Sequence, residues 1–151
     1  MINNSLHPMV QKMAESIPDP IPGDDKTNIN NYIYDLELPD DEPGISVVKT
    51  YAADNLGRMA LRYDAELLII CGVIPHIKKA LYNKNNHVVT ATAYACGCIA
   101  RSGGAQILLN EGFSTILMSI ASDSQRDFYV RDACTRAFGW LHVMREIESK
   151  H

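Results

Sequence analysis

The cysteines and histidines are the side chains of this sequence that could hold a metal ion. Cys96 and Cys98 stand two residues apart in a predicted helix, so their side chains point to different faces. A zinc site takes four ligands, often from cysteines separated by two to four residues, and no second pair lies nearby. His76, His87 and His142 fall in different predicted helices. We therefore expect no metal site.

Motifs of catalysis are missing from the sequence. It contains no Gly-x-Ser-x-Gly nucleophile elbow, no phosphate-binding glycine loop with its lysine, and no His-Glu-x-x-His pair. The run Ser102-Gly103-Gly104 is rich in glycine, but it ends a predicted helix, whereas a phosphate loop begins one. We therefore predict a protein that is not an enzyme and needs no cofactor.

Charge is spread unevenly along the 151 residues, which carry a net charge of −4. Residues 1–46 hold nine acidic side chains against Lys12 and Lys26, and the rest of the chain holds twelve basic against nine acidic ones. An acidic arm is thus joined to a mildly basic body. Because the bases are scattered and the chain is acidic overall, nucleic acid ranks behind protein as a partner. The bases considered are Lys78, Lys79, Lys84, Arg101, Arg126 and Arg131.

Length and composition fit a single domain over residues 1–151. No run reaches the roughly 18 apolar residues of a membrane helix, and the polar start of the chain lacks the charged and apolar regions of a signal peptide. Four cysteines lie in apolar helical patterns, unlike the loop framework of a secreted disulfide protein. We expect a soluble intracellular protein, cytoplasmic or nuclear, with reduced cysteines and no membrane insertion.

A repeat of about forty residues organises the sequence. Several residues of one segment recur forty places later, and a third copy follows after forty-two: Val48, Leu56, Gly57, Ala60 and Gly72; Val88, Cys96, Gly97, Ala100 and Gly112; Val130, Phe138, Gly139 and Leu141. A fixed period of this size indicates stacked helical units. Glycine within a helix costs about 1 kcal/mol against alanine, so Gly57, Gly97 and Gly139 predict a close approach between neighbouring helices.

The pattern Gly-x-Ile-Pro-x-Ile-x-x-x-Leu from Gly72, then a polar turn and Val-x-x-x-Thr-x-Tyr-Ala-Cys-Gly-Cys-Ile-Ala from Val88, resembles the armadillo repeat. The resemblance is good over residues 64–142. It implies an all-α fold, a short right-handed armadillo-like α-solenoid of about three repeats, each with a short first helix, a second helix and a long third helix. The expected helices are 64–71, 73–82 and 86–102 in the second repeat (64–102), and 105–111, 113–121 and 126–148 in the third (104–148).

The first repeat, residues 5–62, is expected to lack its opening helix. Residues 6–14 align with 74–81 on a shared proline and would form its second helix, and 45–61 its third. The excess residues, 17–43, are expected to form an acidic insertion that interrupts this repeat. Within it, four apolar residues at helical spacing predict a short amphipathic helix: Ile29, Tyr32, Ile33 and Leu36.

In the armadillo family, two positions of each third helix face a concave groove, often a tryptophan and an asparagine four residues later. Here the first position is Asp54, Tyr94 and Arg136, and the second is Arg58, Cys98 and Trp140. No pair keeps the tryptophan and asparagine combination, so the usual clamp on an extended peptide does not follow. The six residues are candidates for binding a partner. The alternative is that Trp140 packs within its helix and Arg136 pairs with Asp132.

The resemblance implies a non-catalytic interaction module, an adaptor or a small subunit of a larger complex. One alternative is a helical domain that binds a small ligand or substrate between the acidic insertion and the body. Another is an acidic arm that occupies the groove at Arg58 and Arg136 until a partner displaces it. The last helix carries apolar residues with no later helix to cover them: Val130, Cys134, Phe138, Leu141, Met144 and Ile147. We expect the exposed ends of the stack to be covered by the insertion folded back on them, by a second copy of the chain, or by a larger partner.

Overall fold

The computed structural model describes residues 25–150, and this part of the chain is helical without a strand, which confirms the all-α class there. The helices are α2 (Asp25–Leu36), α3 (Ile45–Arg62), α4 (Ala65–Ile70), α5 (Val73–Ala80), α6 (Asn86–Ile99), α7 (Ala105–Asn110), α8 (Phe113–Ala121) and α9 (Phe128–Ser149), with a π-helical turn at Ala100–Gly104. The helix predicted at 6–14 lies outside the described residues.

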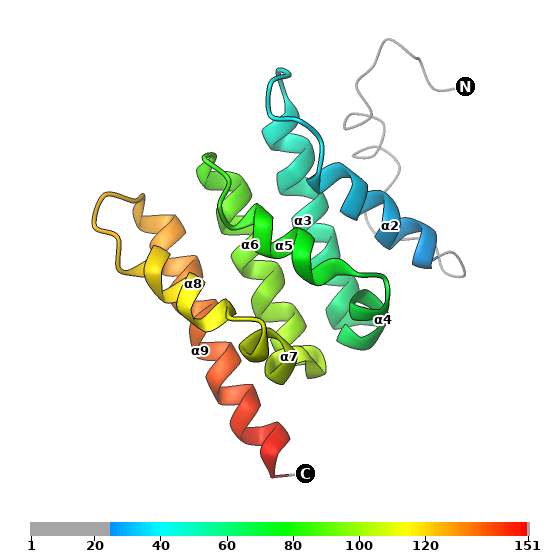
Figure 1. Cartoon of the computed structure of the whole chain (residues 1–151), viewed down its shortest axis with the longest axis vertical. Helices are drawn as coiled ribbons and strands as arrows, with labels where there is room; N and C mark the ends of the chain where they lie inside the picture. Colours follow the sequence, from blue (N-terminus) through cyan, green and yellow to red (C-terminus); the bar gives the residue numbers. More distant parts are fainter. Residues whose placement is uncertain (1–24, 151) are drawn as a thin grey trace.

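The long helices α3, α6 and α9 lie side by side, α3 against α6 and α6 against α9 (Figure 1). The shorter helices α2, α5 and α8 lie across this row, each against the long helix that follows it: α2 on α3, α5 on α6 and α8 on α9. The short helices α4 and α7 connect one long helix to the next unit. The three long helices therefore form one layer of the fold.

Polar caps and glycines set the starts of the helices. Asp64, Asn85 and Asp127 accept backbone N–H bonds at the starts of α4, α6 and α9, with distances of 2.7, 2.8 and 2.7 Å, which satisfies donors that a helix leaves unpaired. Gly72 and Gly112 precede α5 and α8 with φ of 86° and 85°, a conformation that glycine adopts without a steric penalty. This shared conformation explains why the two glycines recur forty residues apart.

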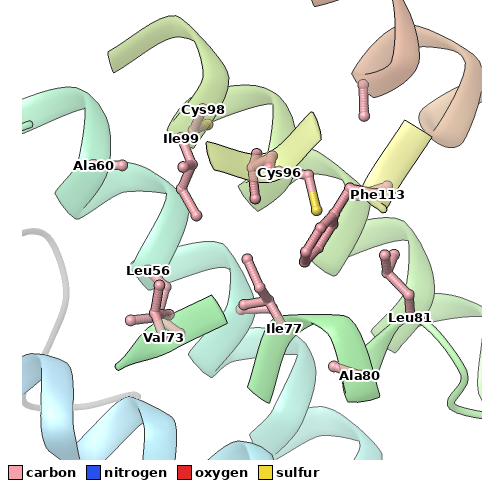
Figure 2. Close-up of a cluster of buried hydrophobic side chains, with 14 of the residues drawn as sticks. Leu56, Ala60, Val73, Ile77, Ala80, Leu81, Cys96, Cys98, Ile99 and Phe113 are labelled. Atoms are coloured by element: carbon pink, nitrogen blue, oxygen red, sulfur yellow. The ribbon is translucent and has the colours of Figure 1, made fainter. Parts of the chain in front are cut away.

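One hydrophobic core runs through the molecule. Figure 2 shows Leu56 of α3, Ile77 of α5, Cys96 of α6 and Phe113 of α8 in one cluster, and all four are fully buried. The side chains come from three different units of the repeat. Burial of this apolar surface is the main force that holds the helices together.

Helix α2 belongs to the same core. The amphipathic helix expected within 17–43 forms, and Ile29, Tyr32, Ile33 and Leu36 are all buried against the body. Helix α2 also contacts α5. The part of the expected insertion that the structure describes is thus packed as the body is, and it holds the position on α3 that α5 holds on α6.

The three glycines of the long helices meet different surroundings. A β carbon on Gly57 would lie 3.1 Å from the Cα of Ala95, and one on Gly97 would lie 3.4 Å from Cδ1 of Trp140. The close approach expected at Gly57 is confirmed, and Gly97 lies at ordinary contact distance. A β carbon on Gly139 would meet nothing within 4 Å, so the expectation of a close approach is wrong there.

The apolar residues of α9 are also more covered than expected. Val130, Cys134 and Leu141 are fully buried, and Phe138 and Met144 pack against the core, because α6, α7 and α8 all contact α9. Of the residues expected to be uncovered, Ile147 remains 45% exposed. Besides Ile147, the exposed apolar side chains of this helix are Trp140 and Val143, together with Phe128 and Tyr129 at its start.

Candidate groove between the long helices α6 and α9

The six candidate residues lie along the layer of long helices, two on each. Asp54 and Arg58 lie on α3, Tyr94 and Cys98 on α6, and Arg136 and Trp140 on α9. All except Cys98 reach the surface. Cys98 is fully buried, and its Sγ would lie 3.2 Å from a β carbon on Gly57, so the close contact between α3 and α6 removes it from the surface.

A groove of about 490 Å³ lies between α6 and α9. It brings together three of the candidates, Tyr94, Arg136 and Trp140, and does not include Asp54 or Arg58. Four further polar or aromatic residues line it that the sequence did not single out for this surface: Thr90, Arg101, Tyr129 and Asp132. The remaining lining consists of small residues, which keep the space between the two helices open: Ala93, Gly97, Ala133 and Ala137.

Arg101 is held in the groove by three contacts. Its Nε donates to the carbonyl oxygen of Gly97 at 3.3 Å, and a terminal nitrogen donates to Sγ of Cys98 at 3.5 Å. The guanidinium carbon lies 4.7 Å from the centroid of a Trp140 ring, a cation–π arrangement. Spacing along the chain does not indicate this position, because Trp140 lies on another helix.

The two arginines among the six candidate residues pair with aspartates of their own helices. Arg58 lies 3.2 Å from Asp54 on α3, and Arg136 lies 2.9 Å from Asp132 on α9. The pair between Arg136 and Asp132 confirms that part of the alternative to the groove interpretation. The charge of each arginine is therefore neutralised within its own helix. Neither arginine forms an ion pair with a residue of α2 or of the acidic segment after it.

Tyr94 keeps its proton in this setting. A hydrogen bond with Cys98 raises the pKa of Tyr94, and burial raises it further. Burial also raises the pKa of the Cys98 thiol. Tyr94 and Cys98 therefore add no negative charge to the groove at neutral pH.

A second polar cluster joins the acidic segment to the body at α3 and α5. Glu37 accepts from Lys79 at 2.7 Å and lies 2.6 Å from Nδ1 of His76. Asp40 lies 2.8 Å from Nζ of Lys49. The hydrogen bond from Lys79 is the main cause that lowers the pKa of Glu37, and the hydrogen bond from Lys49 lowers that of Asp40.

This second cluster borders a hollow of about 330 Å³, at the place where a small ligand between the acidic segment and the body would bind. Its charged groups pair with one another, and Asn83 donates to Asp40 at 3.3 Å. Lys49, although its side chain is only 7% exposed, has its carboxylate partner. The cluster therefore fastens two parts of the chain together and offers few free polar groups to a ligand.

No group of three or more His, Cys, Asp or Glu side chains within residues 25–150 could hold a metal ion. In the same part of the chain, none of the helices has both the length and the apolar character that crossing a bilayer requires. Comparisons of the chain with protein-family models, with curated proteins and with solved structures found no match.

Proposed function

We propose that this protein is a non-catalytic protein-binding module, an adaptor or small subunit of a larger complex, which holds a partner in the groove between α6 and α9. The observation that carries the proposal is the lining of that groove. It combines the only tryptophan of the chain, two tyrosines and two arginines, and these residue types dominate the binding energy of protein interfaces. Tyr129 is 73% and Tyr94 is 40% exposed, so a partner would cover apolar surface.

The proposal includes an armadillo-like α-solenoid of about three repeats. The side-by-side order of α3, α6 and α9, with α2, α5 and α8 across them, supports this arrangement. The repeated contact between a glycine of one long helix and an alanine of the next supports it too, at Gly57 with Ala95 and at Gly97 with Ala137. We place this role inside the cell, in the cytoplasm or nucleus, and the four free cysteines fit a reducing compartment.

Capture of partners from an extract of the native source tests the proposal. The wild-type protein, Tyr129→Ala in the groove and Tyr34→Ala on α2 are compared by quantitative mass spectrometry. Tyr34 is 67% exposed and lies on a different helix from the groove residues, so it controls for the loss of an exposed tyrosine. We expect a set of proteins that Tyr129→Ala loses and Tyr34→Ala retains. Equal capture by all three proteins would contradict binding in the groove.

A homodimer remains a second proposed mode of association. The outer face of α9 supports it, because Val143 is 53% exposed and Ile147 45% exposed beside the open position at Gly139. Sedimentation of the full chain over a wide concentration range tests this mode, with Val143→Glu as the variant. A monomer at every concentration would contradict it.

A further inference from the structure

Arg101 differs from Arg58 and Arg136 in its hydrogen-bond partners. Arg58 and Arg136 each pair with an aspartate four residues earlier. The residue four before Arg101 is Gly97, which has no side chain to offer and supplies its carbonyl oxygen instead. Across residues 25–150, no carboxylate oxygen lies within ion-pair distance of the Arg101 guanidinium. With glycine at position 97, the described part of the chain therefore gives the Arg101 guanidinium no carboxylate counterion.

The guanidinium is fixed and directed before any partner binds. Two hydrogen bonds and the ring of Trp140 hold it, so little side-chain freedom remains to be lost on binding. It is also half-buried, and a charge that is partly removed from water interacts more strongly with an opposite charge. A planar guanidinium is suited to a carboxylate, which it can bind through two parallel hydrogen bonds.

The charges of the groove favour a single negative charge. Arg101 and Arg136 contribute two positive charges, and Asp132 contributes one negative charge that is already paired with Arg136. One positive charge remains, at Arg101. A carboxylate neutralises it, whereas a doubly charged phosphate would add negative charge beside Asp132.

We propose that the groove between α6 and α9 recognises an aspartate or glutamate side chain of a partner protein, with its carboxylate bonded to Arg101. The inference rests on the proposed function of the groove and adds the chemistry of the partner. The exposed rings of Tyr129 and Trp140, at the same groove, receive the apolar side chains that flank the acidic residue.

A positional scan with short synthetic peptides tests this assignment. One position of otherwise degenerate peptides is fixed as glutamate, glutamine, lysine or phosphoserine, and binding to the full chain is measured by fluorescence anisotropy. We expect glutamate to bind better than glutamine by roughly tenfold or more, the value of a hydrogen-bonded charge. Arg101→Gln should abolish this preference, and Arg101→Glu should shift it toward lysine. Arg145→Gln, a change at an exposed arginine of α9 outside the groove lining, should retain it.

The outcomes separate this inference from the function on which it rests. Peptides that bind and compete with one another but show no preference for glutamate would overturn the role of Arg101 and leave the binding groove in place. A preference for phosphoserine would overturn the assignment to a single carboxylate. Failure of every peptide, together with partner capture that Tyr129→Ala does not change, would overturn both. The preference of the wild-type protein for glutamate over glutamine tests the inference even if an Arg101 variant does not fold.

Discussion

Gly57 of α3 lies so close to Ala95 of α6 that a β carbon on the glycine would be 3.1 Å from the Cα of the alanine. The same β carbon would lie 3.2 Å from Sγ of Cys98. Neighbouring backbone cannot move away as a flexible side chain can. The spacing of α3 and α6 therefore depends on a residue without a side chain at position 57.

We expect Gly57→Ala to destabilise the protein relative to Gly139→Ala. Both changes remove a glycine from a helix, which should contribute about 1 kcal/mol of stability. Only the change at Gly57 forces an atom against neighbouring backbone, at a cost on the order of 1–3 kcal/mol. Urea unfolding of the two variants gives the difference directly, since the helix effect cancels.

The change at Gly139 serves as the matched control. A β carbon there meets nothing within 4 Å, so Gly139→Ala should match or exceed the wild-type free energy of unfolding. Equal stabilities for the two variants would show that α3 and α6 can separate without cost and that the close contact has no energetic weight.

Replacement of Ile29 should show that α2 is part of the core. Its side chain is fully buried, so Ile29→Ala should lower the free energy of unfolding by about 2–5 kcal/mol through lost burial and the cavity that remains. Tyr34→Ala, at an exposed position of the same helix, should change it by less than about 0.5 kcal/mol. A small effect at Ile29, measured by thermal or urea unfolding, would mean that α2 detaches from the body at little cost.

The cluster around Glu37 predicts a stability that depends on pH. The pKa of Glu37 is lowered from its ordinary value of 4.5, first by the hydrogen bond from Lys79. Its contribution is therefore fully present above the pKa of the unfolded chain and is lost as pH falls through the lower pKa of the folded state. Glu37→Gln should be less stable than wild type near neutral pH, and the two should converge in acid.

Melting temperatures of both proteins between neutral pH and acid check this prediction. Glu146→Gln, a change at an exposed carboxylate of α9, should follow the wild-type curve. Added salt should reduce the difference at neutral pH, because exposed ion pairs are screened. A difference that persists unchanged in acid would assign the effect of Glu37→Gln to packing.

The four cysteines should react with thiol reagents at different rates. Cys71 is partly exposed, whereas Cys96, Cys98 and Cys134 are buried. Burial raises the pKa of Cys96 and Cys98, and raises that of Cys134 to about 11, so their reactive thiolate forms are scarce at neutral pH. In the folded protein we expect one fast reaction, which Cys71→Ser removes, and three that require unfolding. Rapid reaction of all four in native buffer would contradict this.

The repeat of about forty residues predicted the positions of most helices, because the residues that recur include those that end or begin a helix. Gly72 and Gly112 mark breaks in the helical pattern, and each adopts the positive φ that glycine favours. The place of α2 could not be predicted in the same way. Its apolar spacing indicated a helix, but the alignment of prolines assigned the second helix of the first repeat to residues 6–14 and treated 17–43 as an insertion.

The groove was predicted in part for a similar reason. Family positions identified Tyr94, Arg136 and Trp140, which lie together. They also identified Cys98, which the contact with Gly57 buries. Arg101 was missed because its partner Trp140 lies on another helix, and spacing along the chain carries no information about such a contact.

The open surface at Gly139 could accept a further long helix beside α9. The two preceding glycines of its type each receive the backbone of a neighbouring helix at an alanine, Ala95 or Ala137. A designed unit joined after residue 150, with alanine at the matching position, could therefore seat its own long helix on α9 with no change to the existing residues. The described helices would in this way serve as the first part of a longer row, extended one segment at a time.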